Sequence, residues 1–243
     1  MNRFILLPLL LLAFRAFGSD EFVVVTDSHG VGEFGASLSN WLRSRKETQF
    51  EFFASGGSAP LQWLNDAYKT PCGLKESSLE IAPDPRTCNV LHTPTLESLW
   101  ANHKMSPLSH RKITLIVQGT NFGIKPEIYQ EQLRATKKLM KVALANSDEC
   151  IWIGPPNMRR SPGFDEGGVE YKVSLIKAAL ELTEKETNKA CVFIDSREIS
   201  QYPTNGDGIH YHWPGSKDSE SIERAHQWGE ALAARVESIL IKP

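Results

Sequence analysis

The sequence lacks an excess of positive charge, an internal repeat and any low-complexity tract. Its 27 lysine and arginine residues are slightly outnumbered by 29 aspartate and glutamate residues, so the formal net charge is −2. Nucleic-acid-binding domains usually carry a concentrated basic surface, because much of their affinity comes from phosphate contacts. The composition therefore indicates no nucleic-acid partner, and nothing points to a repeat architecture.

Long hydrophobic runs are also missing, with one exception near the N-terminus. The run FILLPLLLLAF (residues 4–14) is about half of the ~20 residues that a membrane-spanning helix needs, and it contains a proline. A positive charge precedes the run and small residues follow it, which is the order of a secretory signal peptide. We therefore predict that residues 1–18 are a signal peptide cleaved near Gly18. The mature domain, residues 19–243, would then be secreted or periplasmic, without a stable membrane anchor.

Cysteine is scarce, and no C-x-x-C spacing supports a zinc site. Four cysteines in an exported chain instead favour two disulfides. Cys72 and Cys88 enclose a proline-rich stretch, whereas Cys150 and Cys191 each lead into a strand-like run. We predict the pairs Cys72–Cys88 and Cys150–Cys191, the second because neighbouring parallel strands would bring its two cysteines together.

Short apolar runs alternate with longer amphipathic stretches along the mature chain. Five runs rich in β-branched and aromatic residues are predicted strands, at residues 21–26, 49–54, 113–118, 150–154 and 191–195. Helices are predicted at about 33–45, 126–146, 169–188 and 219–241. This βαβα alternation predicts a mostly parallel sheet with helices on both faces. The predicted fold class is α/β, a single-domain three-layer α/β/α sandwich with a five-stranded sheet.

One segment interrupts the alternation. Residues 69–111 contain five prolines and are predicted to form a single short helix near 95–103. An irregular piece of this length in a compact domain is usually functional. We therefore predict an irregular insertion or lid, closed by the Cys72–Cys88 disulfide.

A G-x-G-x-x-G pattern (Gly30, Gly32, Gly35) follows the first predicted strand and is associated with dinucleotide binding. In a dinucleotide-binding fold the first glycine follows the strand almost directly. Here Asp27, Ser28 and His29 intervene, and the acidic residue expected after the second strand is missing. The pattern therefore favours close packing around a turn rather than a dinucleotide site.

Polar residues follow the predicted strands at four places, and ligands of parallel α/β sheets bind beyond the carboxyl ends of the strands. The four segments are Asp27-Ser28-His29, Ser55-Gly56-Gly57-Ser58, Gly119-Thr120-Asn121 and Asp207-Gly208-Ile209-His210.

The last of these segments has a spacing suited to acid–base chemistry. Asp207 is close enough in sequence to His210 to hold one tautomer of the imidazole, which leaves the other nitrogen free to take a proton from a serine. A metal site made of Asp207, His210 and His212 is the alternative, but no further ligand cluster supports it.

In this order, the four segments resemble the four blocks of the SGNH/GDSL hydrolase family, which supply Ser, Gly, Asn and His. The resemblance covers essentially the whole mature chain and implies a flavodoxin-like fold. It also implies a serine esterase that needs no metal or organic cofactor. Ser28 would be the nucleophile, His210 the base, and Asp207 the carboxylate that orients His210.

The resemblance further implies an oxyanion hole made by the N–H groups of Ser28 and of Gly57 or Gly56, with the side-chain amide of Asn121. We favour Gly57, because the family's glycine is usually followed by small residues. The chain departs from the family at Thr26, where a glycine usually precedes the Asp-Ser pair.

A small exported hydrolase of this kind resembles the family's carbohydrate esterases, which remove O-acetyl groups from peptidoglycan or extracellular polysaccharide. The expected partner is an acylated carbohydrate or another small ester. The alternatives are a lipase or thioesterase acting on longer acyl chains, and an acetyltransferase or polysaccharide-binding protein of the same fold. The sequence indicates no oligomeric state. The candidate substrate contacts are Asp27, His29, Trp63, Trp100 and Tyr211, with His103 nearby.

Overall fold

The computed structural model describes residues 19–80, 87–104, 109–159 and 166–241. The predicted signal peptide, residues 1–18, lies outside the described residues. Within the described ranges, no helix has the length and apolar character needed to cross a bilayer.

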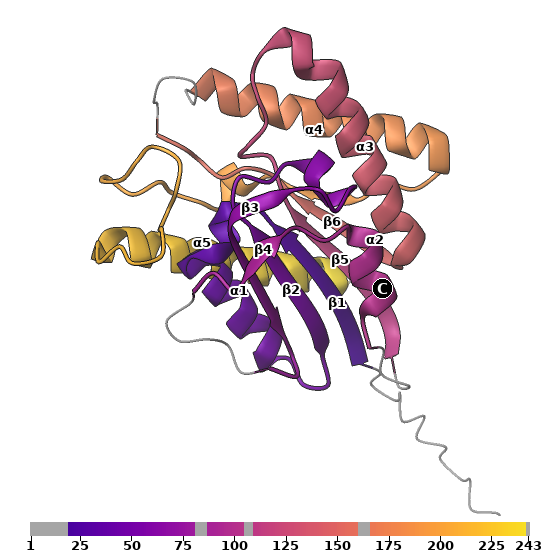
Figure 1. The fold of residues 1–243 in the computed structure, drawn as a ribbon, viewed down its shortest axis with the longest axis horizontal. Helices are drawn as coiled ribbons and strands as arrows, with labels where there is room; N and C mark the ends of the chain where they lie inside the picture. The colour runs from indigo at the N-terminus through magenta and orange to yellow at the C-terminus, as the bar shows by residue number, and fades with distance from the viewer. Residues whose placement is uncertain (1–18, 81–86, 105–108, 160–165, 242–243) are drawn as a thin grey trace, which may run out of the picture.

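A seven-stranded sheet in the order β4-β3-β2-β1-β5-β6-β7 forms the centre of the protein (Figure 1). Strands β2, β1, β5, β6 and β7 pair in parallel and correspond to the five predicted strands. Strands β3 and β4 add two antiparallel strands at one edge, so the sheet is larger than predicted. The α/β class and the mostly parallel sheet are confirmed. The bounds are β1 (Ser19–Thr26), β2 (Gln49–Ser55), β3 (Lys69–Ser77), β4 (Val90–His92), β5 (Ser109–Val117), β6 (Glu149–Ile153) and β7 (Val192–Ile194).

Helices cover both faces of this sheet (Figure 1). Helices α1 and α5 pack together on one face, and α2, α3 and α4 pack together on the other. The predicted helices all form, with ends shifted by a few residues. Their bounds are α1 (Glu33–Ser44), α2 (Leu96–Asn102), α3 (Tyr129–Asn146), α4 (Glu166–Thr187) and α5 (Ser219–Leu240).

The side chains of β1 alternate between two hydrophobic cores. Phe22 and Val24 belong to the core under α1 and α5, whereas Val23 and Val25 belong to the core under α3 and α4. All four side chains are fully buried. Burying an aliphatic or aromatic side chain stabilises the fold by roughly 1.5–3 kcal/mol. The strand is therefore apolar at consecutive positions because both of its faces are covered.

The prediction that residues 69–111 form an irregular insertion is wrong. The described parts of this segment form β3, β4, α2 and the first residues of β5, and β3 pairs with β2 from Glu51–Ser77 to Ser55–Gly73. The short helix predicted near 95–103 is confirmed as α2. Strand β3 (KTPCGLKES) gives no strand signal, because it contains proline, glycine and charged residues, which are tolerated towards the edge of a sheet. The described parts of this segment therefore extend the sheet.

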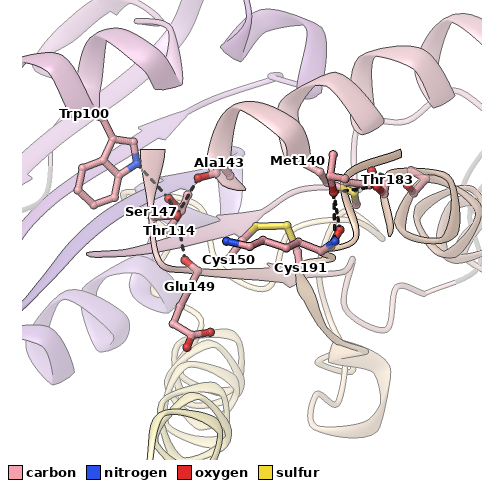
Figure 2. The surroundings of a disulfide bond; sticks show 12 residues. Trp100, Thr114, Met140, Ala143, Ser147, Glu149, Cys150, Thr183 and Cys191 are labelled. Carbon is pink, nitrogen blue, oxygen red and sulfur yellow. Dashed lines mark hydrogen bonds between the residues drawn. A yellow bond between two sulfur atoms is a disulfide. The ribbon is translucent and has the colours of Figure 1, made fainter. Parts of the chain in front are cut away.

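Both predicted disulfides are confirmed. Cys150 lies in β6 and Cys191 immediately precedes the parallel neighbour β7, so their Cα atoms are 4.5 Å apart (Figure 2). Cys72 of β3 is bonded to Cys88, with Cα atoms 5.1 Å apart. In the chain-entropy model, bridges that close loops of these lengths contribute about 3–4 kcal/mol each. Such bridges are typical of proteins in oxidising compartments.

Candidate active site

Ser28 lies directly beyond the carboxyl end of β1, as the first residue of a short 3-10 turn (Ser28–Val31). Asp27 caps this turn by accepting a hydrogen bond from the N–H of His29 (3.1 Å). The N–H of Asp27 donates to the carbonyl of Val117 at the end of β5 (3.2 Å). Backbone hydrogen bonds therefore fix the turn against the sheet, and its first N–H, that of Ser28, has no partner inside the turn.

A continuous chain of hydrogen bonds joins Ser28, His210 and Asp207. Oγ of Ser28 lies 3.0 Å from Nε2 of His210, and Nδ1 of His210 lies 2.6 Å from Oδ2 of Asp207. Oδ1 of Asp207 accepts the N–H groups of Ile209 and His210, both at 2.8 Å. An imidazole that donates from Nδ1 to a carboxylate keeps the lone pair of Nε2, which can accept the serine proton.

The Asp207 carboxylate is held in its ionised form by these contacts. Partial burial raises the pKa of Asp207, but the hydrogen bonds from the His210 ring and from two backbone N–H groups outweigh it and leave the pKa below its ordinary value. Tyr202, which the sequence did not single out, fixes the same loop. Its hydroxyl accepts the N–H of Gly208 (2.8 Å) and donates to the carbonyl of His210 (3.2 Å).

Two glycines near Ser28 make contacts too close for a side chain. A Cβ atom at Gly32 would lie 2.5 Å from the carbonyl oxygen of His212, in the loop that carries His210. A Cβ atom at Gly30 would lie 1.6 Å from Oγ1 of Thr26. Both distances exclude a side chain. Glycines of the G-x-G-x-x-G pattern are therefore needed for packing around Ser28.

The loop after β2 carries Gly56 and Gly57, whose backbone N–H groups differ in availability. Gly57 has φ +71°, a left-handed conformation that favours glycine. The N–H of Gly56 donates to the carbonyl of Cys72 in β3 (2.8 Å), and the carbonyl of Gly56 accepts the hydroxyls of Tyr68 and Thr70. Gly57 is exposed, and within the described ranges its N–H makes no hydrogen bond. Strand β3 thus holds the loop and leaves the Gly57 N–H for a ligand.

Asn121 joins this loop to the one that follows β5. Its Nδ2 donates to the carbonyl of Ser58 (2.8 Å), and an amide nitrogen carries a second hydrogen that remains for another acceptor. The turn that carries the candidate nucleophile is joined to the end of β5 by the hydrogen bond from the Asp27 N–H to the carbonyl of Val117 (3.2 Å), and the hydroxyl of Thr120 lowers the pKa of the Asp27 carboxylate. The residues after β1, β2 and β5 are therefore directly connected.

Three ionisable groups are buried beneath these loops. Burial raises the pKa of Asp27 to about 6, although the N–H of His29 and the hydroxyl of Thr120 act in the opposite direction. Burial lowers the pKa of His29 to about 3. Burial also lowers the pKa of Lys172 to about 8, against the opposing effect of Asp27. Lys172 was not identified from the sequence, because it lies in α4 among ordinary surface lysines.

The five residues predicted to contact substrate are buried. Asp27, His29, Trp63, Trp100 and Tyr211 have relative exposures of 1%, 2%, 0%, 7% and 0%. Ser28 itself is only 3% exposed, so low exposure does not decide the matter, and direct substrate contact by these five residues stays a prediction.

Two of these aromatic residues have structural roles. Nε1 of Trp63 donates to Oγ of Ser58 (3.1 Å), in the loop beside Asn121. Nε1 of Trp100 donates to Oγ1 of Thr114 (3.0 Å), as Figure 2 shows near the disulfide of β6 and β7. His103, also considered, forms a buried pair with Glu21.

Trp213 is the exposed aromatic residue beside the site. Its side chain is 41% exposed, and its ring centroid lies 4.9 Å from that of His210. Trp213 follows His210 by three residues in Asp-Gly-Ile-His-Tyr-His-Trp, and this spacing is the sequence signal that places it beside the site.

A metal centre is not found in this part of the protein. Nε2 of His212 faces the carbonyl of Ser216 (3.2 Å) rather than Asp207. Across the residues that the structure describes, no group of three or more His, Cys, Asp or Glu side chains is arranged to hold a metal ion.

No protein-family model matches the sequence, and no curated protein matches it. The structure, in contrast, is similar to solved esterases. A carbohydrate acetylesterase family member from Sinorhizobium meliloti superimposes with a TM-score of 0.56 at 17% identity, over 91% of this chain and 99% of that one. A catalytic mutant of an acetylxylan esterase from Geobacillus stearothermophilus gives 0.52 at 10% identity, over 91% and 96%. The chain therefore has the α/β/α fold of these esterases, the fold that the SGNH resemblance implies.

Proposed function

We propose that the protein is an exported serine esterase that removes O-linked acyl groups, chiefly acetyl, from a cell-wall or extracellular carbohydrate. The observation that carries the proposal is the hydrogen-bonded chain from Ser28 through His210 to Asp207 at the carboxyl edge of the sheet. A serine, an imidazole and a carboxylate in this order form an activated nucleophile on many unrelated folds.

In this mechanism Ser28 attacks the acyl carbon while His210 takes its proton at Nε2. His210 then returns the proton to the departing sugar hydroxyl, and water releases the acyl group from Ser28 by the same steps in reverse. Asp207 orients the ring and stabilises its protonated form. The low pKa of Asp207 keeps this carboxylate charged at neutral pH.

The oxyanion of the tetrahedral intermediate is held by the N–H groups of Ser28 and Gly57 and by the Asn121 amide. Gly57 is favoured over Gly56 because the Gly56 N–H is already bonded to Cys72. Donors placed in advance where charge develops stabilise the transition state more than the bound substrate. Removing one such donor typically lowers kcat by ~10²–10³.

Two observations support a carbohydrate ester as substrate. Trp213 presents an exposed aromatic surface beside His210, which suits the apolar face of a sugar ring. The structural neighbours from Sinorhizobium meliloti and Geobacillus stearothermophilus are a carbohydrate acetylesterase family member and an acetylxylan esterase. Export is supported by the two disulfides and by the signal-like residues 1–18.

The test is release of acetate from O-acetylated peptidoglycan and from acetylated xylan by wild type and Ser28→Ala. Ser174→Ala, at an exposed position of α4, is the matched control and should behave as wild type. Loss of acetate release in Ser28→Ala alone supports the proposal, whereas full activity in that variant overturns it.

A series of nitrophenyl esters separates the alternative substrates. Activity that peaks on the acetyl ester favours the carbohydrate esterase, and activity that rises with acyl length favours a lipase. Acetyl transfer to an added sugar faster than to water would identify a transferase.

A further inference from the structure

Lys172 is a fully buried lysine in α4. Its ammonium donates a hydrogen bond to the carbonyl oxygen of Thr120, the residue immediately before Asn121. Burying an ammonium group costs several kcal/mol unless hydrogen bonds and an opposite charge compensate. A position that only had to fill the interface between α4 and the sheet would be occupied at lower cost by an apolar side chain.

The opposite charge near Lys172 is Asp27, which is also buried and precedes the candidate nucleophile. The Asp27 carboxylate accepts the N–H of His29 inside the turn that carries Ser28. The N–H of Asp27 donates to the carbonyl of Val117 at the end of β5 (3.2 Å), and the hydroxyl of Thr120, in the loop after β5, lowers the pKa of the Asp27 carboxylate. Asp27 therefore links the Ser28 turn to the loop after β5. Lys172 interacts with both parts, through the carbonyl of Thr120 and the charge of Asp27.

We propose that Lys172 is a positioning residue that holds the Asn121 loop against the Ser28 turn, through the Thr120 carbonyl and the charge of Asp27. Lys172 touches no substrate in this arrangement. It fixes the backbone at Thr120, and thereby fixes the side-chain amide of Asn121 relative to Oγ of Ser28. This inference rests on the proposed esterase function.

A misplaced oxyanion donor has a defined kinetic consequence. The donor interacts with charge that exists only in the transition state, so its displacement lowers kcat and leaves KM nearly unchanged. The effect of removing Lys172 should also depend on Asn121, because two residues that act on one interaction are not additive. A residue with a purely structural role in α4 would show neither pattern.

The test is Lys172→Met, assayed on nitrophenyl acetate in the wild-type and Asn121→Ala backgrounds. Lys177→Met, at an exposed position of the same helix, is the matched control. We expect Lys172→Met to lower kcat by at least tenfold with KM within twofold of wild type. In the Asn121→Ala background the same change should lower kcat by less than threefold.

Circular dichroism will show whether Lys172→Met folds. If it does not, the double variant Asp27→Asn/Lys172→Met, which removes both buried charges together, takes its place. Equal effects in the two backgrounds, or an unchanged kcat, would overturn the positioning role. A Ser28→Ala variant with full activity would instead overturn the esterase assignment, so the two failures are distinguishable.

Discussion

Replacing His29 with leucine should make the fold less sensitive to acid. The His29 ring is buried and packs edge-on against Trp228, with ring centroids 5.2 Å apart. Within the described part of the chain, neither ring nitrogen has a hydrogen-bond partner. Burial lowers the pKa of His29 from 6.5 to about 3. The stability that depends on neutral His29 is therefore present above pH 6.5 and is lost as the pH falls towards 3.

The magnitude follows from proton linkage at 1.36 kcal/mol per pKa unit. Between pH 7 and 5 the unfolded chain takes up about 0.7 proton at residue 29 and the folded chain takes up almost none, and the integrated difference lowers the free energy of unfolding by about 2 kcal/mol.

Asp27 acts in the opposite direction. Its pKa is raised from 3.8 to about 6 in the folded chain, so as the pH falls the folded chain binds this proton before the unfolded chain does. The resulting stabilisation is present at low pH and is lost as the pH rises through 6. Over the same interval, pH 7 to 5, Asp27 contributes about 1.3 kcal/mol of stabilisation, which offsets much of the loss at His29. In His29→Leu the Asp27 contribution remains, because the hydrogen bond to Asp27 comes from the backbone N–H of residue 29.

The assay is urea unfolding followed by tryptophan fluorescence at pH 7 and pH 5. Lowering the pH from 7 to 5 should reduce the stability of wild type, relative to that of His29→Leu, by about 2 kcal/mol of unfolding free energy. His92→Leu, at an exposed histidine, is the control and should follow wild type. Equal pH dependence in wild type and His29→Leu would refute the reasoning.

Three further changes test other parts of the structure. Asn121→Ala should lower kcat on nitrophenyl acetate by ~10²–10³ with little change in KM, because the amide acts on the oxyanion; a rise in KM alone would contradict this role in steady-state assays. Trp213→Ala should raise KM about tenfold for acetylated xylo-oligosaccharides and leave kinetics on nitrophenyl acetate unchanged, with Trp213→Phe closer to wild type. An equal effect on both substrates would argue against a sugar contact. Cys150→Ala/Cys191→Ala should lower the free energy of unfolding by about 3–4 kcal/mol in urea, and wild type with a reductant should approach the variant; unchanged unfolding midpoints would show that the bridge constrains little.

Much of the fold was predictable because its signals are local. The parallel strands are covered on both faces, so the second halves of β1 (FVVVT) and β5 (ITLIV) appear in the sequence as mostly apolar runs. Cys150 and Cys191 could be paired because each stands next to such a run. Strands β3 and β4 were not predictable in this way, since the pairing of β3 with β2 and of β4 with β3 depends on chain reversal and on backbone hydrogen bonds rather than on an apolar pattern.

The order of the reactive groups along the chain is readable from the sequence, because Ser28 and Asn121 each follow a locally encoded strand within a few residues and the Asp207–His210 pair lies in the loop between β7 and α5. Which neighbours of these groups are exposed depends instead on the packing of the folded chain. Tyr211 is fully buried and Trp213, two residues later in the same loop, is 41% exposed. A loop has no periodicity from which this difference could be read. Burial and the pairing of Lys172 with Thr120 both depend on segments far apart in the chain, which meet only when the helices pack on the sheet.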